Sequence, residues 1–149
     1  MAEQCPGKSV GGIYEKHGKI LMLYRRYEPY GWACVAGHIE EDESPEQALL
    51  KEYDEESGLE VRGFQFLFDE VVLWNNCHRS NNNGHHWWLY KILRTRGEVK
   101  ICEEETRVDP KIGKSWGWFA PEEIAELELE PVWRYFFEKL GYTKRKLEQ

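Results

Sequence analysis

The first forty residues alternate between short apolar runs and breaks that contain glycine or proline. Residues 8–15 and 19–25 are rich in Val, Ile, Leu and Tyr, and a polar segment that includes a glycine, residues 16–19, joins them. Two apolar runs connected by a tight turn predict a β-hairpin. A third extended segment, residues 31–37, follows the next break in the pattern. We therefore expect three short strands before the chain becomes strongly charged.

Residues 44–58 carry both the start and the stop signals of a helix. Ser44 is a suitable N-cap, Pro45 suits the first helical position, and Gln47 completes a capping box with the serine. Gly58 suits the left-handed position that follows a helix C-terminus. These residues predict a helix that runs from about residue 45 to residue 57.

Three further strands are predicted in the second half of the chain. Residues 64–74 and 86–93 have the composition of longer strands, and the polar residues 75–84 between them have strong turn chemistry. Residues 94–113 are irregular and charged, and residues 116–119 then predict a last strand.

Two short helices are predicted after the last strand. Pro121 starts one, with residues 122–126 as its body, and Pro131 starts another that runs to about residue 140. The second has an apolar stripe at helical spacing, formed by Trp133, Phe136, Phe137 and Leu140. Because no repeat or long linker interrupts the pattern, we expect a single domain over residues 1–149, with a flexible tail over 141–149.

The composition fits a folded domain that has one strongly acidic segment. Of the 149 residues, 41% are hydrophobic and 14% aromatic, which is far from the composition of disordered chains. The formal net charge is −7, yet residues 40–60 alone contain ten acidic residues and one lysine. The remainder has 17 acidic and 19 basic residues and is nearly neutral. Nucleic acid is therefore an unfavourable partner, because its binding needs clustered Lys and Arg, and a cation is a favourable one.

Neither a membrane span nor a disulfide framework is indicated. No apolar run reaches the length of about 18 residues that a transmembrane helix needs, and the first ten residues lack the apolar stretch of a signal peptide. The four cysteines are scattered, and no two of them form a Cys-x-x-Cys motif. We expect a soluble cytoplasmic protein with free thiols; its oligomeric state, monomer or homodimer, stays open.

Three carboxylates share one face of the predicted acidic helix. Glu52 lies one turn from both Glu55 and Glu56. Like charges repel at this spacing, and the helix dipole disfavours negative charge near the C-terminal end. A bound cation would offset both effects, and carboxylate oxygens are ligands that suit Mg²⁺ or Mn²⁺. A solvated acidic helix face is the alternative interpretation.

The spacing of these residues resembles the Nudix box. The box reads Gly-x5-Glu-x7-Arg-Glu-U-x-Glu-Glu-x-Gly-U, where U is a bulky apolar residue, and residues 37–59 follow it in one unbroken register. The matching positions are Gly37, Glu43, Glu52, Glu55, Glu56, Gly58 and Leu59, and Glu40 matches a Glu that the family usually has between the first Gly and the next Glu. The flanking segments also resemble the Nudix (MutT-like) hydrolase family, so that the resemblance covers most of residues 8–127.

The match to the family pattern has four departures. Lys51 replaces the usual Arg, which substitutes a point charge for a planar donor. Val35-Ala36 stands where the family often has Pro-Gly, Asp42 stands where it often has Gly, and Tyr53 is a larger apolar residue than usual. None of these changes removes a carboxylate, and Lys51 is the departure that bears on catalytic efficiency.

The resemblance implies a fold, an activity and a set of site residues. The fold is α/β (α+β), a Nudix-type α/β/α sandwich with a central mixed β-sheet. The activity is hydrolysis of the diphosphate linkage of a nucleoside diphosphate derivative, by attack of water with the help of Mg²⁺ or Mn²⁺. The implied metal ligands are Glu52, Glu55, Glu56 and the backbone carbonyl of Gly37. The implied supporting residues are Glu43 and Glu40, and Lys51 would take the orienting role of the missing Arg.

We expect the catalytic residues to be Glu52, Lys51 and Glu55, with Glu52 as the first choice for the general base. The alternatives for the base, or for a further metal ligand, are Glu103, Glu104 and Glu105, each of which could instead be a solvated loop charge. Substrate contacts are expected from Arg25 and Arg26, which suit phosphate, and from Trp32, which suits stacking on a base. Trp74 and Trp87 are alternatives to Trp32.

A nucleoside triphosphate is the first expectation for the substrate, because little chain remains for an additional substrate domain. ADP-ribose, dinucleoside polyphosphates and capped RNA are the alternatives. A protein of this fold that senses a nucleotide without hydrolysing it is a reading of another class. An acidic interaction module is a third, although it would leave the spacing of the box unexplained.

Overall fold

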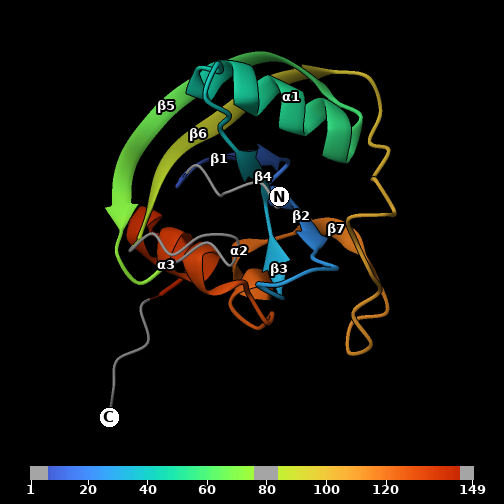
Figure 1. Ribbon diagram of the computed structural model, residues 1–149. Helices are drawn as coiled ribbons and strands as arrows, with labels where there is room; N and C mark the ends of the chain where they lie inside the picture. The colour runs from blue at the N-terminus through green and yellow to red at the C-terminus, as the bar shows by residue number, and fades with distance from the viewer. Residues whose placement is uncertain (1–6, 76–83, 145–149) are drawn as a thin grey trace. The chain divides into compact units, whose positions relative to one another are not determined.

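The computed structural model describes residues 7–75 and 84–144. Its contacts divide the chain into two compact units, which interleave along the sequence. Of the described residues, the first unit contains 7–14, 35–75 and 84–102, and the second contains 15–34 and 103–144. Each unit is described in turn below, and Figure 1 labels their helices and strands.

The first unit is built on a mixed sheet in the order β4-β1-β6-β5. Strand β1 (Lys8–Lys16) pairs in parallel with β6 (His85–Arg96) and antiparallel with β4 (Val35–His38). Strand β5 (Glu60–Val72) pairs antiparallel with β6. Helix α1 (Pro45–Ser57) packs against β4 and β5. The predicted α+β class with a mixed sheet is confirmed.

Helix α1 follows its sequence signals residue by residue. The Ser44 hydroxyl accepts a hydrogen bond from the Gln47 amide at 3.1 Å, and the Gln47 side chain accepts one from the Ser44 amide at 2.9 Å. At the other end, Gly58 adopts the left-handed conformation with φ of 72°, and its N–H donates to the carbonyl of Asp54. The predicted capping box and C-terminal glycine are therefore both confirmed.

The core under α1 depends on a glycine that the sequence pattern does not single out. Tyr53 is fully buried, and its hydroxyl donates to the carbonyl of Gly12 in β1 at 2.7 Å. A Cβ at Gly12 would lie 2.6 Å from the Tyr53 ring and 3.0 Å from side-chain atoms of Leu49 and Ile92. The large residue at position 53 is therefore accommodated because β1 carries a glycine opposite it.

Strand β5 begins four residues earlier than the predicted residue 64, and β6 extends three residues beyond the predicted residue 93. Irregular register at residues 61–63, 63–64 and 66–68 shows that bulges carry β5 through a polar stretch. The sequence reading ended this strand at residue 74, whereas it ends at Val72. Most of the loop expected after it, residues 76–83, lies outside the described residues, as do residues 145–149 of the expected tail.

The second unit is an antiparallel sheet with two helices. Strand β2 (Lys19–Tyr24) pairs with the end of β1, with β3 (Trp32–Ala33) and with β7 (Trp116–Phe119). The predicted hairpin turn is present, with positive φ at His17 and Gly18. The extended segment expected over residues 31–37 is divided between β3 of this unit and β4 of the first.

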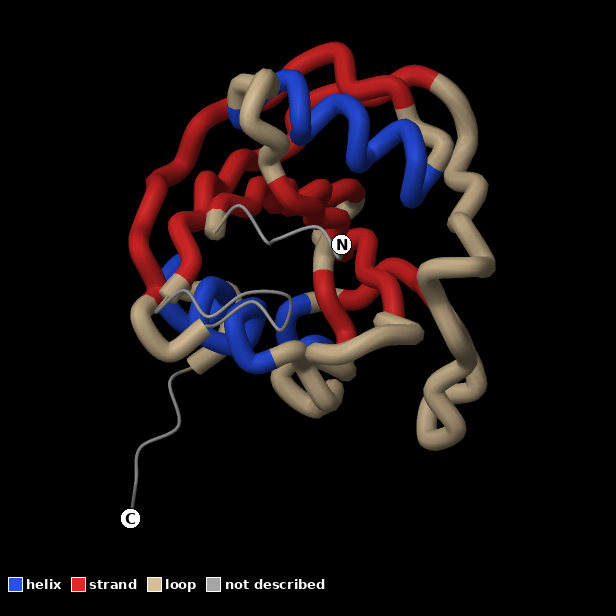
Figure 2. Tube along the Cα trace, viewed as in Figure 1, coloured by secondary structure: helices blue, strands red, loops and turns tan. Residues whose placement is uncertain are grey.

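The two helices of the second unit lie close to their predicted positions. Helix α3 (Pro131–Leu140) buries Trp133, Phe136 and Phe137 of the predicted stripe, while Leu140 is partly exposed. Helix α2 (Pro121–Ile124) is shorter than expected, because the amides of Glu126 and Leu127 bond three residues back and form tighter turns. Figure 2 shows that the chain between β6 and β7 is irregular, as its sequence predicts. Of the helices in the described part of the chain, none has the length and hydrophobicity of a membrane span.

Candidate active site

The carboxylate of Glu52 on α1 lies directly against the backbone of Gly37 on β4. A Cβ at position 37 would collide with the carboxyl carbon and both carboxylate oxygens of Glu52. Gly37 does not have a positive φ, so the glycine is required here for space and not for its backbone conformation. The first glycine of the box thus allows the carboxylate of Glu52 to approach the strand.

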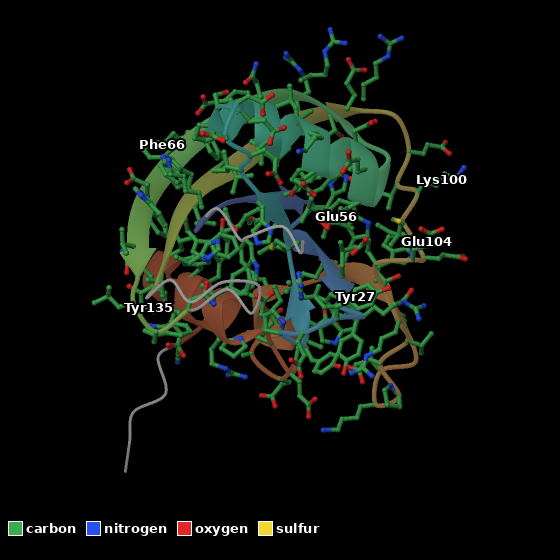
Figure 3. The ribbon with its side chains drawn as sticks, viewed as in Figure 1. Tyr27, Glu56, Phe66, Lys100, Glu104 and Tyr135 are labelled. Atoms are coloured by element: carbon green, nitrogen blue, oxygen red, sulfur yellow. The ribbon has the colours of Figure 1, made fainter. Side chains whose placement is uncertain are left out.

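Glu56 reaches the same short segment of β4. Its Oε1 accepts a hydrogen bond from the backbone N–H of Ala36 at 3.3 Å. Glu56 and Glu52 are both partly buried, whereas Glu55 is exposed to solvent. Figure 3 shows Glu56 near the C-terminal end of α1. Two of the three predicted carboxylates therefore meet the strand at residues 36–37, and the third lies on the solvent side of the helix.

Lys51 ties the helix to the loop that precedes it. Its Nζ lies 2.8 Å and 3.0 Å from the two carboxylate oxygens of Glu43. The same carboxylate accepts a hydrogen bond from the Glu40 amide at 2.9 Å, and the Glu43 amide donates to the Glu40 carbonyl. Glu43 thus closes the loop and joins it to α1, while Glu40 takes part through its backbone and its side chain is exposed.

The ion pair shifts the pKa of both partners. The hydrogen bond from Lys51 lowers the pKa of the Glu43 carboxyl. The same bond raises the pKa of the Lys51 amine, and the nearby carboxylates of Glu52 and Glu55 raise it further. Lys51 is therefore held in its charged form among three carboxylates.

The donors near Gly37 are carboxylate and carbonyl oxygens, which suit a hard divalent cation. The space beside Gly37 that a side chain would fill is occupied by the Glu52 carboxylate, so the strand leaves room for oxygen ligands at this point. Within residues 7–75 and 84–144, however, no three His, Cys, Asp or Glu side chains are gathered closely enough to hold a metal ion together. The donor oxygens thus suit a divalent metal ion in their chemistry, while in the described residues no three of these side chains lie together around one point.

The two arginines predicted to contact phosphate hold the loop after β2 in the second unit. Arg25 donates from Nε to the carbonyl of Pro29 at 2.8 Å, and the same atom lies 3.7 Å from the Glu130 carboxylate. Arg26 donates from Nε to the carbonyl of Thr106 at 2.9 Å and from Nη2 to that of Glu103 at 3.3 Å. Both guanidinium groups therefore have local structural partners.

Trp32, predicted to stack on a base, is a core residue in the structure. It is fully buried, and its Nε1 donates to the carboxylate of Asp109 at 2.7 Å. Its ring packs against those of Tyr24 and Phe119. In this conformation the ring has no exposed face for a base. Among the alternatives, Trp87 is buried as well, and Trp74 has about half of its surface exposed.

The site residues predicted from the sequence are divided between the two units. The box residues Gly37, Glu40, Glu43, Lys51, Glu52, Glu55 and Glu56 come together in the first unit. The second unit contains the other candidates, Arg25, Arg26, Trp32, Glu103, Glu104 and Glu105. The last three have exposed side chains, and the carbonyls of Glu103 and Glu105 accept hydrogen bonds from Arg26. Whether one of these glutamates acts as a base stays a prediction.

Sequence reasoning missed two residues, one that contacts the candidate site in the first unit and one that contacts Trp32 in the second unit. Ala36 supplies the amide that binds Glu56, and Asp109 accepts both the Trp32 indole and the Lys111 amide. Asp109 is 3% exposed, which its position in a charged, irregular stretch does not suggest. The spacing of the box does not indicate either residue, because Ala36 lies 20 positions from Glu56 and Asp109 lies 77 positions from Trp32.

Comparison with known proteins gives a consistent result. A family model described as the NUDIX domain matches residues 6–140. The CTP pyrophosphohydrolase of Escherichia coli is 28% identical over 128 residues, which cover 83% of this chain and 82% of that protein. An RNA pyrophosphohydrolase of Photobacterium profundum is 31% identical over 110 residues. That match covers 72% of this chain, which spans about half (49%) of the relative's length.

A solved structure shares the fold. The MutT NUDIX hydrolase of Burkholderia pseudomallei superimposes with a TM-score of 0.69 and covers 89% of this chain and 96% of its own. Only 21% of the aligned residues are identical, so this likeness supports the fold alone.

Proposed function

The chain belongs to the NUDIX family of hydrolases, and from this premise we propose that it is a Mg²⁺- or Mn²⁺-dependent pyrophosphohydrolase of a nucleoside triphosphate. The observation that carries the proposal is the position of Glu52 against Gly37, with Glu56 bound to the neighbouring amide. Helix α1 thereby brings two carboxylates to the same short segment of β4 in the first unit. Carboxylate oxygens are the ligands of a divalent ion that assists phosphoryl transfer.

The residues of the first unit would divide the work among them. Those that would hold the ion are Glu52, Glu55, Glu56 and the carbonyl of Gly37. The ion, when bound, would neutralise phosphate charge and make water a better nucleophile. Lys51 and Glu43 keep the loop joined to α1 and so hold the orientation of the helix face. Positioning of this kind supplies much of the catalysis in phosphoryl transfer.

Glu52 is our proposal for the general base. Glu52 is partly buried and its carboxylate lies against the strand, whereas Glu55 is exposed to solvent. A base must lie within hydrogen-bond reach of the water that it deprotonates, which a fixed carboxylate beside the ligand oxygens would satisfy. The alternatives remain Glu103, Glu104 and Glu105 in the second unit.

The charge of the chain favours a free nucleotide over RNA as substrate, because a polyanion needs clustered Lys and Arg and residues 40–60 are strongly acidic. Relatives of both names match over most of both chains: the match covers 82% of the CTP pyrophosphohydrolase of Escherichia coli and 86% of an RNA pyrophosphohydrolase of Cereibacter sphaeroides. We therefore place a nucleoside triphosphate first and keep ADP-ribose and dinucleoside polyphosphates as alternatives. The alternative from another functional class is a sensor that binds a nucleotide without hydrolysing it.

A substrate panel tests the proposal. The purified chain is incubated with the four ribonucleoside and four deoxyribonucleoside triphosphates, ADP-ribose, diadenosine polyphosphates and 5′-triphosphorylated RNA. Each reaction contains Mg²⁺, Mn²⁺ or EDTA, and released pyrophosphate and phosphate are measured. Metal-dependent pyrophosphate from a triphosphate is the expected result. Turnover of another member alone would replace the substrate, and nucleotide binding without any product would support the sensor.

A further inference from the structure

Four side chains of the second unit, here called the stack, form a series of ring–ring and cation–π contacts from the core to the surface, in which the Trp32 and Tyr24 rings are tilted by 52°. The ring centroids of the buried residues Trp32 and Tyr24 are 5.4 Å apart. The guanidinium carbon of Arg107 lies 5.1 Å from the centroid of the Tyr24 ring and 4.8 Å from that of Tyr30. Tyr30 has 50% of its surface exposed. The last ring of the stack is therefore accessible to a ligand in solution.

Hydrogen bonds hold the stack at both ends. At the buried end, the Trp32 indole donates to Asp109 at 2.7 Å. In the middle, the Arg107 amide donates to the Tyr24 carbonyl at 3.2 Å. At the exposed end, the loop that carries Tyr30 is closed by a backbone bond from the Arg25 amide to the Gly31 carbonyl at 3.0 Å. A ring held in advance loses little conformational entropy when a ligand stacks on it.

The chemistry of the exposed end suits a planar, aromatic ligand. Tyrosine rings and arginine planes are the surfaces on which nucleobases stack in proteins. A polyanionic strand is disfavoured, because the loops that surround the stack, residues 25–31 and 103–107, contain four glutamates and three arginines. The Glu103 and Glu105 backbones are bound directly to Arg26 of the first of these loops. The base of a single nucleotide is therefore favoured over a nucleic acid.

We propose that Tyr30, backed by Arg107 and Tyr24, is a binding platform for the base of a nucleotide. The inference rests on the proposed function for the nature of the ligand, since a nucleotide hydrolase must meet a base. It assigns base contact to Tyr30, in place of the buried Trp32 that the sequence favoured. The proposal concerns the base alone and requires no contact between Tyr30 and the box carboxylates. Its test therefore measures base binding without turnover.

Binding of nucleoside monophosphates in the presence of EDTA tests this platform. The four monophosphates AMP, CMP, GMP and UMP are titrated into the full chain, and binding is followed by NMR chemical shifts and by calorimetry. The variants are Tyr30→Leu, Tyr30→Phe and the control Tyr27→Leu, which removes a similarly exposed tyrosine of the same loop (labelled in Figure 3). We expect Tyr30→Leu to weaken binding about tenfold or more, and the other two variants to bind as the unaltered chain does.

A second variant and a base-free probe complete the test. Arg107→Gln removes the cation behind Tyr30 and should weaken monophosphate binding several-fold, while inorganic pyrophosphate, titrated in the presence of Mg²⁺, should bind all variants equally. Unchanged affinity in both Tyr30→Leu and Arg107→Gln, equal loss in Tyr27→Leu, or no binding of any monophosphate would overturn the inference. Tyr30-dependent binding in a chain that hydrolyses nothing would remove the proposed function alone, and hydrolysis without Tyr30 dependence would remove the platform alone.

Discussion

The collision expected between a side chain at position 37 and the Glu52 carboxylate makes Gly37 a direct probe of the site. The carboxylate is the far end of a flexible side chain, so Gly37→Ala should displace it and leave the fold intact. We expect kcat to fall at least about tenfold, while the free energy of unfolding changes by less than about 1 kcal/mol. Steady-state kinetics and urea unfolding measure the two quantities.

Gly63 in β5 offers a matched control for this substitution. It is also a strand glycine without positive φ, and a Cβ there would meet its nearest atom at an ordinary 3.7 Å. Gly63→Ala should therefore keep full activity. A Gly37→Ala variant with unaltered kcat would show that Glu52 does not need its observed position.

Lys51 is the residue at which the chain departs from the family's arginine, and its contact with Glu43 defines its role. We expect Lys51→Arg to retain activity, because a guanidinium can bridge both carboxylate oxygens that the amine contacts. Lys51→Met should lower kcat severalfold and cost about 1 kcal/mol of stability or less, since the pair is partly exposed. Equal rates for Lys51→Met and the unaltered chain would mean that the pair does not position the site.

Glu130 makes the stability of the second unit depend on pH. Burial raises the pKa of its carboxyl to about 7, and the Arg25 guanidinium opposes this only in part. The unfolded chain releases this proton near pH 4.5, so the folded state binds more protons between about pH 4.5 and 7, and stability falls as pH rises through that range. The Cys34 thiol, whose pKa burial raises, also faces Glu130.

Replacement of Glu130 by glutamine should remove that part of the pH dependence. We expect the unfolding free energy of Glu130→Gln, relative to that of the unaltered chain, to rise by about 3 kcal/mol between about pH 4.5 and neutral pH. Glu128→Gln, at an exposed ion pair with Lys111, is the control and should leave the pH profile unaltered. Urea unfolding from about pH 4.5 to about pH 8 measures both profiles. The same profile for the two variants would show that Glu130 does not cause the pH dependence.

At the scale of elements, the C-terminal glycines of α1 and α3 separate backbone strain from packing. Gly58 and Gly141 are both left-handed, with φ of 72° and 83°. A Cβ at Gly58 would also lie 3.1 Å from the Cβ of Lys100, whereas a Cβ at Gly141 would meet nothing within 4 Å. Gly141→Ala should cost about 1 kcal/mol from strain alone, and Gly58→Ala should cost more. Equal unfolding free energies would show that the contact with Lys100 relaxes without cost.

The elements that the sequence predicts best are those whose signals are local. Helix α1 begins and ends where Ser44, Gln47 and Gly58 indicate, because each of these residues acts within one turn. Strand β5 was placed too late, because bulges around Gly63 and Leu67 break the alternation on which strand prediction depends. The hairpin turn at His17 and Gly18 again follows local chemistry.

The same distinction applies to the candidate site. The box lies within 23 consecutive residues, so its spacing alone identifies Glu52, Glu56 and Lys51. The burial of Trp32 depends on Asp109, which is 77 residues away in sequence, and no local pattern reports that contact. Tyr30 could be identified as the exposed end of the stack only after Arg107 had been placed beside it.

For the whole molecule, the position of the charge matters more than its total. The net charge of −7 arises from one loop and helix of the first unit, and the remaining residues are nearly neutral. An anionic substrate would be repelled by that segment in the absence of a counter-charge. The proposed divalent ion would resolve this conflict, because its positive charge would offset those of the carboxylates and the phosphates. The proposed activity toward an anionic substrate therefore requires a divalent metal ion.

The most direct test compares Glu52→Gln with the unaltered chain in the hydrolysis of the best nucleoside triphosphate of the panel. Glu41→Gln is the control, an exposed residue of the same acidic segment that lies outside the matching box positions. With Mg²⁺ we expect Glu52→Gln to lose about a hundredfold or more of the rate, Glu41→Gln to keep it, and EDTA to abolish it. Full activity in Glu52→Gln, or a rate that EDTA leaves unaltered, would contradict metal-dependent hydrolysis at the Glu52 carboxylate.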